Sequence, residues 1–163
     1  MTTTAPKYPL ITRTRVIMRA KYGWDRKTVP FSRTELHKPD NYRQDAAGFI
    51  SMCFKIPLDA PGSWGGLNTV NLFTDGWFYE IQPHDLAPGD VVGYLGKDSI
   101  DVDGGTAVVF EKWLNDDQSL GLALTWEHLA VTSPGPDQRA RPIDFRWHAY
   151  RYAGITDSIS IDA

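Results

Sequence analysis

The spacing of hydrophobic residues differs between the first and the later part of this chain, and this difference limits the folds that it can adopt. In residues 13–22 and 46–56 apolar side chains recur every three or four positions, which predicts two amphipathic helices. Further along, short runs of β-branched and aromatic residues predict strands at 77–81, 91–95 and 106–113, and alternating apolar residues predict strands at 120–126 and 143–152. Helices followed by hairpin-like strands are typical of an α+β fold, with N-terminal helices packed on a mostly antiparallel sheet of about four to six strands.

Local signals set the expected ends of the two helices. Thr12 is a good N-cap for the first helix and Gly23 is expected to end it. Asp45 occupies the N-cap position of the second helix, which must stop before Pro57. Between the helices, Pro30 and Pro39 interrupt an aperiodic, charged stretch, so residues 25–43 are predicted to form a long basic loop.

The length and composition predict one domain with a substantial core. The chain has 163 residues, of which 42% are hydrophobic and 12% aromatic, and ~100–200 residues is the usual size of a single domain. We expect a domain over residues 1–155, in which residues 1–11 form an N-terminal arm, and a polar tail at 156–163.

Charge is distributed very unevenly along the sequence. Residues 1–43 carry ten basic and three acidic side chains, a net charge of +7, whereas the other residues carry −10. One interpretation is a basic segment that lies over the acidic body of its own subunit; the other is a two-sided particle whose basic side docks on an acidic neighbour. The overall charge of −3 argues against general nucleic-acid binding.

Several classes of protein are disfavoured by what the sequence lacks. It has no apolar run of ~18 residues that would predict a membrane span, and its first residues do not resemble a secretory signal peptide. Cys53 is the only cysteine, which rules out an intrachain disulfide and a zinc site made of several thiolates. We expect no cofactor.

Three motifs, in order, resemble the NlpC-type peptidoglycan peptidases, a papain-like family of cysteine hydrolases. The run Tyr-Arg-Gln-Asp-Ala-Ala-Gly-Phe-Ile-Ser at 42–51 is similar to the family's Asp-Cys-Ser-Gly-Phe element. Leu-Ala-Pro-Gly-Asp at 86–90 is similar to its Leu-x-Pro-Gly-Asp turn, and residues 105–113 are similar to the strand that begins with its catalytic His. The resemblance extends over about residues 12–155 and implies a papain-like fold.

The same resemblance implies that the catalytic groups are missing. Such a hydrolase needs a thiolate at a helix N-terminus, an imidazole on the facing strand and a third polar group that orients the imidazole. The matching positions hold Ala46 and Thr106, or Gly105 if the alignment shifts by one, and Glu127 lies near the third. We therefore expect a pseudoenzyme with no intact catalytic residue.

Other candidate residues have separate interpretations. Cys53 lies two turns along the helix from Ala46 and is expected to be a buried, inert thiol. Candidates for a residual groove or an interface are Asp45, Trp64, Trp77 and His128; a tryptophan in the Gly-rich loop can anchor a partner or fold back on its own sheet. Asp98, Asp101 and Asp103 weakly suggest a calcium site, but their spacing does not fit an EF-hand and a solvated hairpin tip is the default.

Finer similarities concern small minor tail proteins of phages that infect actinobacteria. They are found in the Tyr-Arg-x-Asp start at 42–45, Ser-Met-Cys at 51–53, Asn-Thr-Val at 68–70, Gly93 and Phe-Glu-Lys-Trp at 110–113. This resemblance implies a structural tail-tip component of the virion, assembled in the host cytoplasm with other tail proteins. The alternatives are a pseudoenzyme that binds cell-wall peptide or glycan, and a hydrolase with relocated catalytic residues such as Glu127 or His128.

Overall fold

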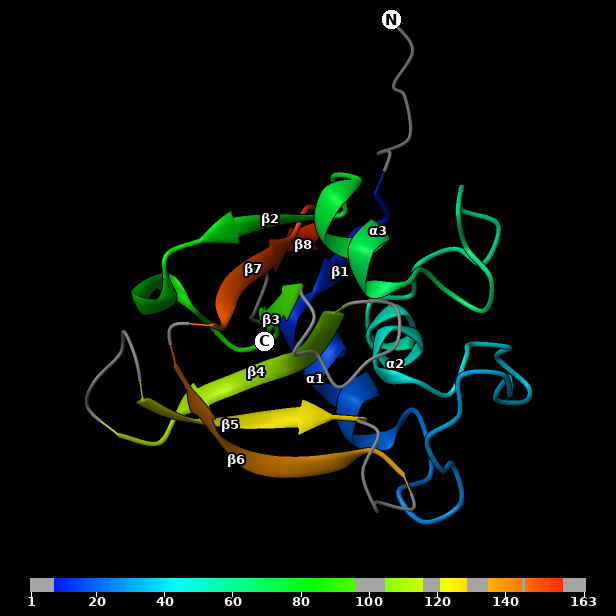
Figure 1. Cartoon of the computed structure of the whole chain (residues 1–163), viewed down its shortest axis with the longest axis horizontal. Coiled ribbons are helices and arrows are strands. Elements are labelled where there is room, and N and C mark those ends of the chain that lie inside the picture. The colour runs from blue at the N-terminus through cyan, green and yellow to red at the C-terminus, as the bar shows by residue number, and fades with distance from the viewer. Residues whose placement is uncertain (1–7, 96–104, 116–120, 129–134, 145, 157–163) are drawn as a thin grey trace, which may run out of the picture.

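The computed structural model describes residues 8–95, 105–115, 121–128, 135–144 and 146–156 (Figure 1). The candidate residues Asp98, Asp101 and Asp103, most of the expected arm at 1–11 and the tail from residue 157 lie outside these ranges. Within them, no helix is long and apolar enough to cross a membrane.

Both predicted helices are present, and their caps explain where they begin. Helix α1 (Arg13–Tyr22) starts after Thr12, whose hydroxyl accepts a hydrogen bond from the Arg15 amide at 3.1 Å. Helix α2 (Ala46–Cys53) starts after Asp45, whose Oδ1 accepts from the Gly48 amide at 2.8 Å. Helix α2 is buried along its whole length.

Two short helical segments were not predicted, and α2 ends earlier than expected. The helix stops at Cys53 rather than at Ile56, because Lys55 adopts a left-handed backbone with φ of 55°. Helix α3 (Thr69–Thr74) follows the Gly-rich loop, and a 3-10 turn, η1 (Pro83–Asp85), follows the first strand of the main sheet. The loop at 25–43 contains no helix or named strand, as predicted.

Six strands form the main sheet, and every neighbouring pair in it is antiparallel. Their order across the sheet is β2-β7-β3-β4-β5-β6. The strands are β2 (Phe78–Ile81), β3 (Val91–Leu95), β4 (Gly105–Trp113), β5 (Gly121–Glu127), β6 (Asp137–Ile143) and β7 (His148–Tyr152). The predicted α+β class and mostly antiparallel sheet are therefore confirmed.

The expected single strand over 143–152 is wrong. Strand β6 ends at Ile143 and β7 begins at His148, and between them the Asp144 carboxylate accepts from the Arg146 amide at 2.9 Å. The Trp147 amide also donates to the Asp144 carbonyl at 3.0 Å, which closes the turn. Residues 143–152, which alternate in the sequence, therefore contain the last residue of β6, a turn and strand β7.

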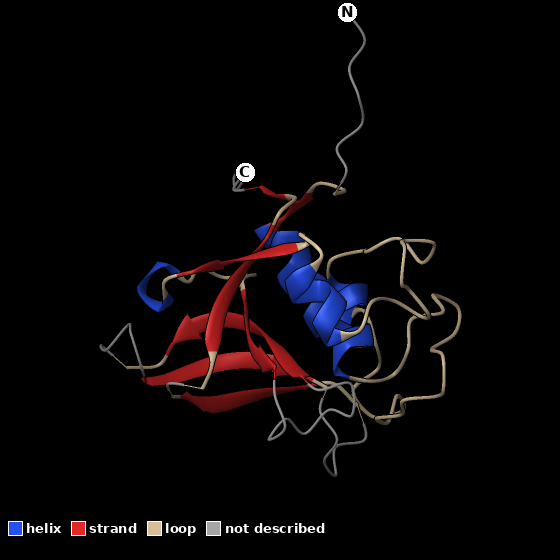
Figure 2. Cartoon of the chain, turned by 45° about the horizontal axis from the view of Figure 1, so that its top comes forward, coloured by secondary structure: helices blue, strands red, loops and turns tan. Residues whose placement is uncertain are grey.

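The sheet is curved and the helices gather on one side of it (Figure 2). Val91, Ala107, Val109 and Trp126 share a core with residues of α1 and α2, whereas Val92, Val108 and Phe110, the sequence neighbours of the first three, belong to a second cluster. That second cluster consists of Ala46, Val92, Val108, Phe110, Ala123, Ile143 and Trp147. A small parallel pair, β1 (Ile11–Thr12) and β8 (Ile155–Thr156), joins the two ends of the described chain.

Candidate functional site

The two positions that match a catalytic Cys and His lie in elements that touch. Ala46 is the first residue of α2, which packs against β4, and it belongs to the same apolar cluster as Val108 of β4. Thr106 is two residues before Val108 and so faces the same side of the strand. Ala46 and Thr106 are both fully buried. The side chains at these two positions are a methyl group and a hydroxyl, and neither can act as a thiolate or as an imidazole.

Cys53 does not replace the missing nucleophile. Its side chain is fully buried in the α2 core, and this burial raises the pKa of its thiol far above the ordinary value. A thiol of this kind stays protonated at neutral pH and is a poor nucleophile.

This burial predicts that Cys53 is protected from alkylation in the folded protein. Iodoacetamide at pH 8 should modify it no faster than the chain unfolds, whereas the protein in urea should react completely, as followed by intact-mass spectrometry. Rapid modification of the native protein would contradict the inert role.

His128 lies in the core and not in an open groove. Its imidazole is 2% exposed, Nε2 lies 2.6 Å from the carbonyl oxygen of Val29, and the ring contacts Trp24, Phe31 and Phe49. Burial lowers the pKa of His128, so the ring is neutral at pH 7. A structural imidazole fits these contacts better than a catalytic base.

Glu127 is held in a structural ion pair. Its two carboxylate oxygens accept from Nε and Nη2 of Arg141 at 2.7 and 2.6 Å, and Oε2 also accepts from the Thr125 hydroxyl at 2.8 Å. The partner Arg141 comes from β6, a strand that the alternation pattern does not reveal. Sequence reasoning therefore finds Glu127 but misses Arg141, the residue that binds its carboxylate.

Asp45 and Trp77 likewise have structural roles. The Asp45 side chain caps α2 through Oδ1 and accepts from Arg43 Nε through Oδ2 at 2.6 Å. Trp77 is 7% exposed and packs edge-on against Tyr8, with ring centroids 4.8 Å apart. The expectation that Trp77 contributes to an exposed interface is corrected, because residues near the start of the chain cover it.

Trp64 is the one interface candidate that remains on the surface. It is 56% exposed, but its backbone is fixed: Arg43 Nη1 donates to its carbonyl oxygen at 2.5 Å and its amide donates to Gly66 at 3.0 Å. Gly65 and Gly66 have positive φ, and a Cβ on either would approach neighbouring side chains within 2.6 Å. An exposed aromatic side chain on a fixed backbone is well suited to anchoring a partner.

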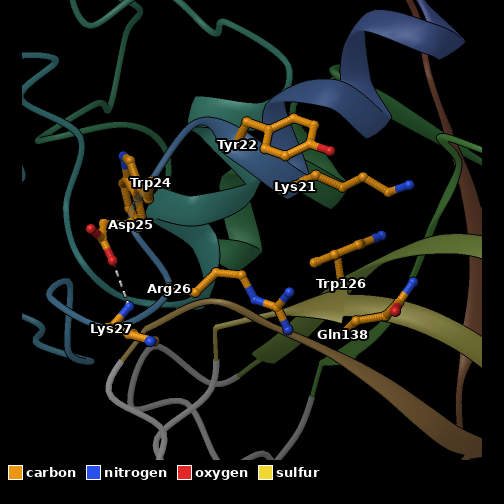
Figure 3. Close-up of a pocket in the computed structure, with 8 residues that line it drawn as sticks. All are labelled: Lys21, Tyr22, Trp24, Asp25, Arg26, Lys27, Trp126 and Gln138. Carbon is orange, nitrogen blue, oxygen red and sulfur yellow. Dashed lines mark hydrogen bonds between the residues drawn. The ribbon is translucent and has the colours of Figure 1, made fainter.

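A basic pocket lies where α1 ends beside the sheet (Figure 3). Its volume is about 530 Å³, and it is lined by Lys21, Tyr22, Trp24, Asp25, Arg26, Lys27, Trp126 and Gln138. The Lys21 ammonium and the Arg26 guanidinium lie 5.9 and 5.2 Å from the ring centroid of Trp126. The pocket thus combines cations from the basic segment with an aromatic floor from β5.

Both interpretations of the charge asymmetry have support within this fold. Arg13 and Arg26 from the basic segment pair with Asp90 and Asp137 of the acidic body at 2.9 and 2.5 Å. For Lys21 and Lys27, the described part of the chain provides no ion pair. The basic segment therefore partly covers its own subunit and partly faces outward.

No metal centre is present in the described ranges, where His, Cys, Asp and Glu do not gather in groups of three or more. Comparisons with protein-family models, with curated proteins and with solved structures found no match. The functional interpretation accordingly rests on the residues of this chain.

Proposed function

We propose that this chain is a catalytically inactive, papain-like NlpC-type module that acts as a structural component of a phage tail tip. The observation that carries the proposal is the contact of α2 with β4, with buried Ala46 and Thr106 at the positions that would need a thiolate and an imidazole. Without these groups a covalent acyl-enzyme cannot form and no general base can activate a nucleophile.

The remaining candidate groups support inactivity, because each one is buried in the core or held in an ion pair. The thiol of Cys53 is buried, the imidazole of His128 meets the Val29 carbonyl, and Glu127 is paired with Arg141. A hydrolase with relocated catalytic residues would need at least one of these groups to face an open site.

A structural role fits the surface features that remain. Trp64 is exposed on a fixed loop, and Lys21 and Lys27 border a basic pocket with an aromatic floor. Aromatic and basic residues of this kind are common anchors in protein interfaces, where charge complementarity orients the partner. The partners we propose are neighbouring tail proteins of the virion, with the basic side of one subunit facing an acidic surface.

The first test is hydrolysis. The native protein should release no peptide from actinobacterial peptidoglycan, because no thiolate–imidazole pair is present. In the double variant Ala46→Cys, Thr106→His, the new thiol should be more reactive than in the single variant Ala46→Cys because the imidazole favours the thiolate, and this should be measurable as ionisation at lower pH, followed by the ultraviolet absorbance of the thiolate. Cys53 serves as the internal control for an unreactive thiol.

Two outcomes would overturn this proposal. Peptide release by the native protein would show that it is an enzyme, and equal thiol reactivity in the single and double variants would show that positions 46 and 106 do not form a vestigial catalytic pair. The virion assignment is tested separately by mass spectrometry of purified particles, in which this chain should be present in a fixed ratio to the other tail proteins.

A further inference from the structure

A second cavity has Thr106 at its inner end. Its volume is about 330 Å³, and it is lined by Tyr94, Thr106, Arg141, Pro142, Asp144, Arg146 and Trp147. Tyr94 and Thr106 are direct cross-strand neighbours on β3 and β4, so their side chains face the same side of the sheet. Thr106 is fully buried, whereas the Arg146 side chain is 50% exposed, which places Arg146 nearer to the mouth.

Among the described residues, the hydroxyl of Thr106 is buried without a partner, as are Trp113 Nε1 and His128 Nδ1, and of these three residues only Thr106 lines this cavity. Its Oγ1 makes no hydrogen bond within the described part of the chain. Leaving a hydroxyl buried and unpaired destabilises the fold, and valine has nearly the same shape without that penalty. Because the unpaired hydroxyl does not stabilise the fold without a ligand, we look for its role in binding.

The charged groups around the cavity form two pairs of opposite sign. Arg141 is paired with Glu127 and Arg146 with Asp144, at 2.6 and 3.1 Å. Arg141 donates to Glu127 through Nε and Nη2. Within the described ranges its Nη1 has no acceptor. The lining itself carries two guanidinium groups and one carboxylate, that of Asp144, and the charges balance only when Glu127, which pairs with Arg141 from outside the lining, is counted.

Aromatic rings hold both guanidinium groups in place. Arg141 lies over the Trp147 ring and Arg146 over the Tyr94 ring, at 5.5 and 6.0 Å from the ring centroids. The two rings meet edge-on with centroids 5.0 Å apart. This arrangement fixes the directions of the charges, and a pocket with ordered charges of both signs favours a ligand that also carries both.

We propose that this cavity binds a small zwitterion of the free amino-acid type. The ligand carboxylate accepts from Arg141 Nη1 and from the Thr106 hydroxyl, and its ammonium donates to the Asp144 carboxylate. With Glu127 counted as the partner of Arg141, the two ion pairs around the cavity balance, and a ligand of zero net charge keeps this balance whereas a simple anion or cation adds one charge. The proposal does not depend on the inactive-module function, since none of its ligand contacts requires a papain-like ancestry.

The experiment is an NMR titration of the ¹⁵N-labelled full chain with L-alanine, propionate and ethylamine. Propionate lacks the ammonium and ethylamine lacks the carboxylate, so the three probes separate the two charges. L-Alanine should shift the signals of Thr106, Arg141 and Trp147 with a dissociation constant of about the millimolar range. Propionate and ethylamine should bind at least about tenfold more weakly.

Variants at the inner end test the hydroxyl. Thr106→Val should weaken L-alanine binding at least about tenfold and raise Tm by about 2–4 °C, because it removes an unpaired buried hydroxyl. Thr106→Ser keeps the hydroxyl and should keep binding. Thr125→Val is the thermal control: its hydroxyl is paired with Glu127 at 2.8 Å, so its loss should lower Tm.

Three results would overturn the inference. They are the absence of any shift with L-alanine, binding of propionate or ethylamine as tight as that of L-alanine, and unchanged binding by Thr106→Val. Each of them leaves the thiol and virion tests of the proposed function unaffected.

Discussion

Replacing Asp90 with alanine is expected to lower the free energy of unfolding by about 3–5 kcal/mol, as measured by urea denaturation. The Asp90 side chain is fully buried and accepts from three groups: Arg13 Nη1 at 2.9 Å, the Arg151 guanidinium at 2.9 and 3.1 Å, and the Ala87 amide at 2.9 Å. Removing the carboxylate leaves two partly buried guanidinium groups without their counter-charge.

A surface ion pair provides the matched control for this loss. In Asp137→Asn, the affected pair with Arg26 has side chains that are 37% and 49% exposed, and the expected cost is at most about 1 kcal/mol. Asp90→Asn preserves the side-chain shape but removes the charge and replaces one accepting oxygen with an amide donor, so it should also be strongly destabilising. If Asp90→Ala costs no more than Asp137→Asn, this buried network does not hold the fold together.

Replacing Arg43 with methionine is expected to cost a similar amount, about 3–5 kcal/mol. The guanidinium is buried and pairs with Asp45, while it also donates to the carbonyl oxygens of Trp64 and Leu67. Methionine keeps the apolar stem but leaves a buried carboxylate and these carbonyl groups unpaired. Urea denaturation measures the loss of stability.

Hydrogen exchange shows whether Arg43 also fixes the Trp64 loop. The Trp64 amide should exchange faster in Arg43→Met, because its bond to Gly66 belongs to the segment that Arg43 holds. Arg43→Lys should restore little of the lost stability, since an ammonium group cannot donate hydrogen bonds to all the acceptors that the guanidinium reaches. Arg139→Met, at a side chain that is 45% exposed, is the control and should leave both the stability and the loop nearly unchanged.

The helices were predictable because their signals are local. Thr12 and Asp45 cap helices whose apolar stripes lie within the next few residues, and both caps are confirmed. The strands β3, β4 and β5 were predictable for the same reason, since the β-branched and aromatic runs of β3 and β4 and the alternation of β5 are visible in the sequence itself. Helix α3 has only six residues, which is too short for a helical period to be recognised.

The networks that hold the candidate sites together were not predictable from local patterns. Asp90 lies 77 positions from Arg13 and 61 from Arg151, and Glu127 lies 14 positions from Arg141. Such partners become visible only when the strand order is known. Strand β6 is largely polar because it lies at the edge of the sheet, so it lacks the alternation that would have revealed Arg141.

The edge position of β6 also affects how copies of this protein could associate. Pro142 lies near the end of β6 and has no amide hydrogen to offer a neighbouring strand, and Arg139 and Arg141 place charge along the same border. A second molecule that tried to continue the sheet there would find an incomplete hydrogen-bonding ladder. Fibre growth by continuation of the sheet through β6 is therefore disfavoured, which leaves β2 as the other edge of the main sheet.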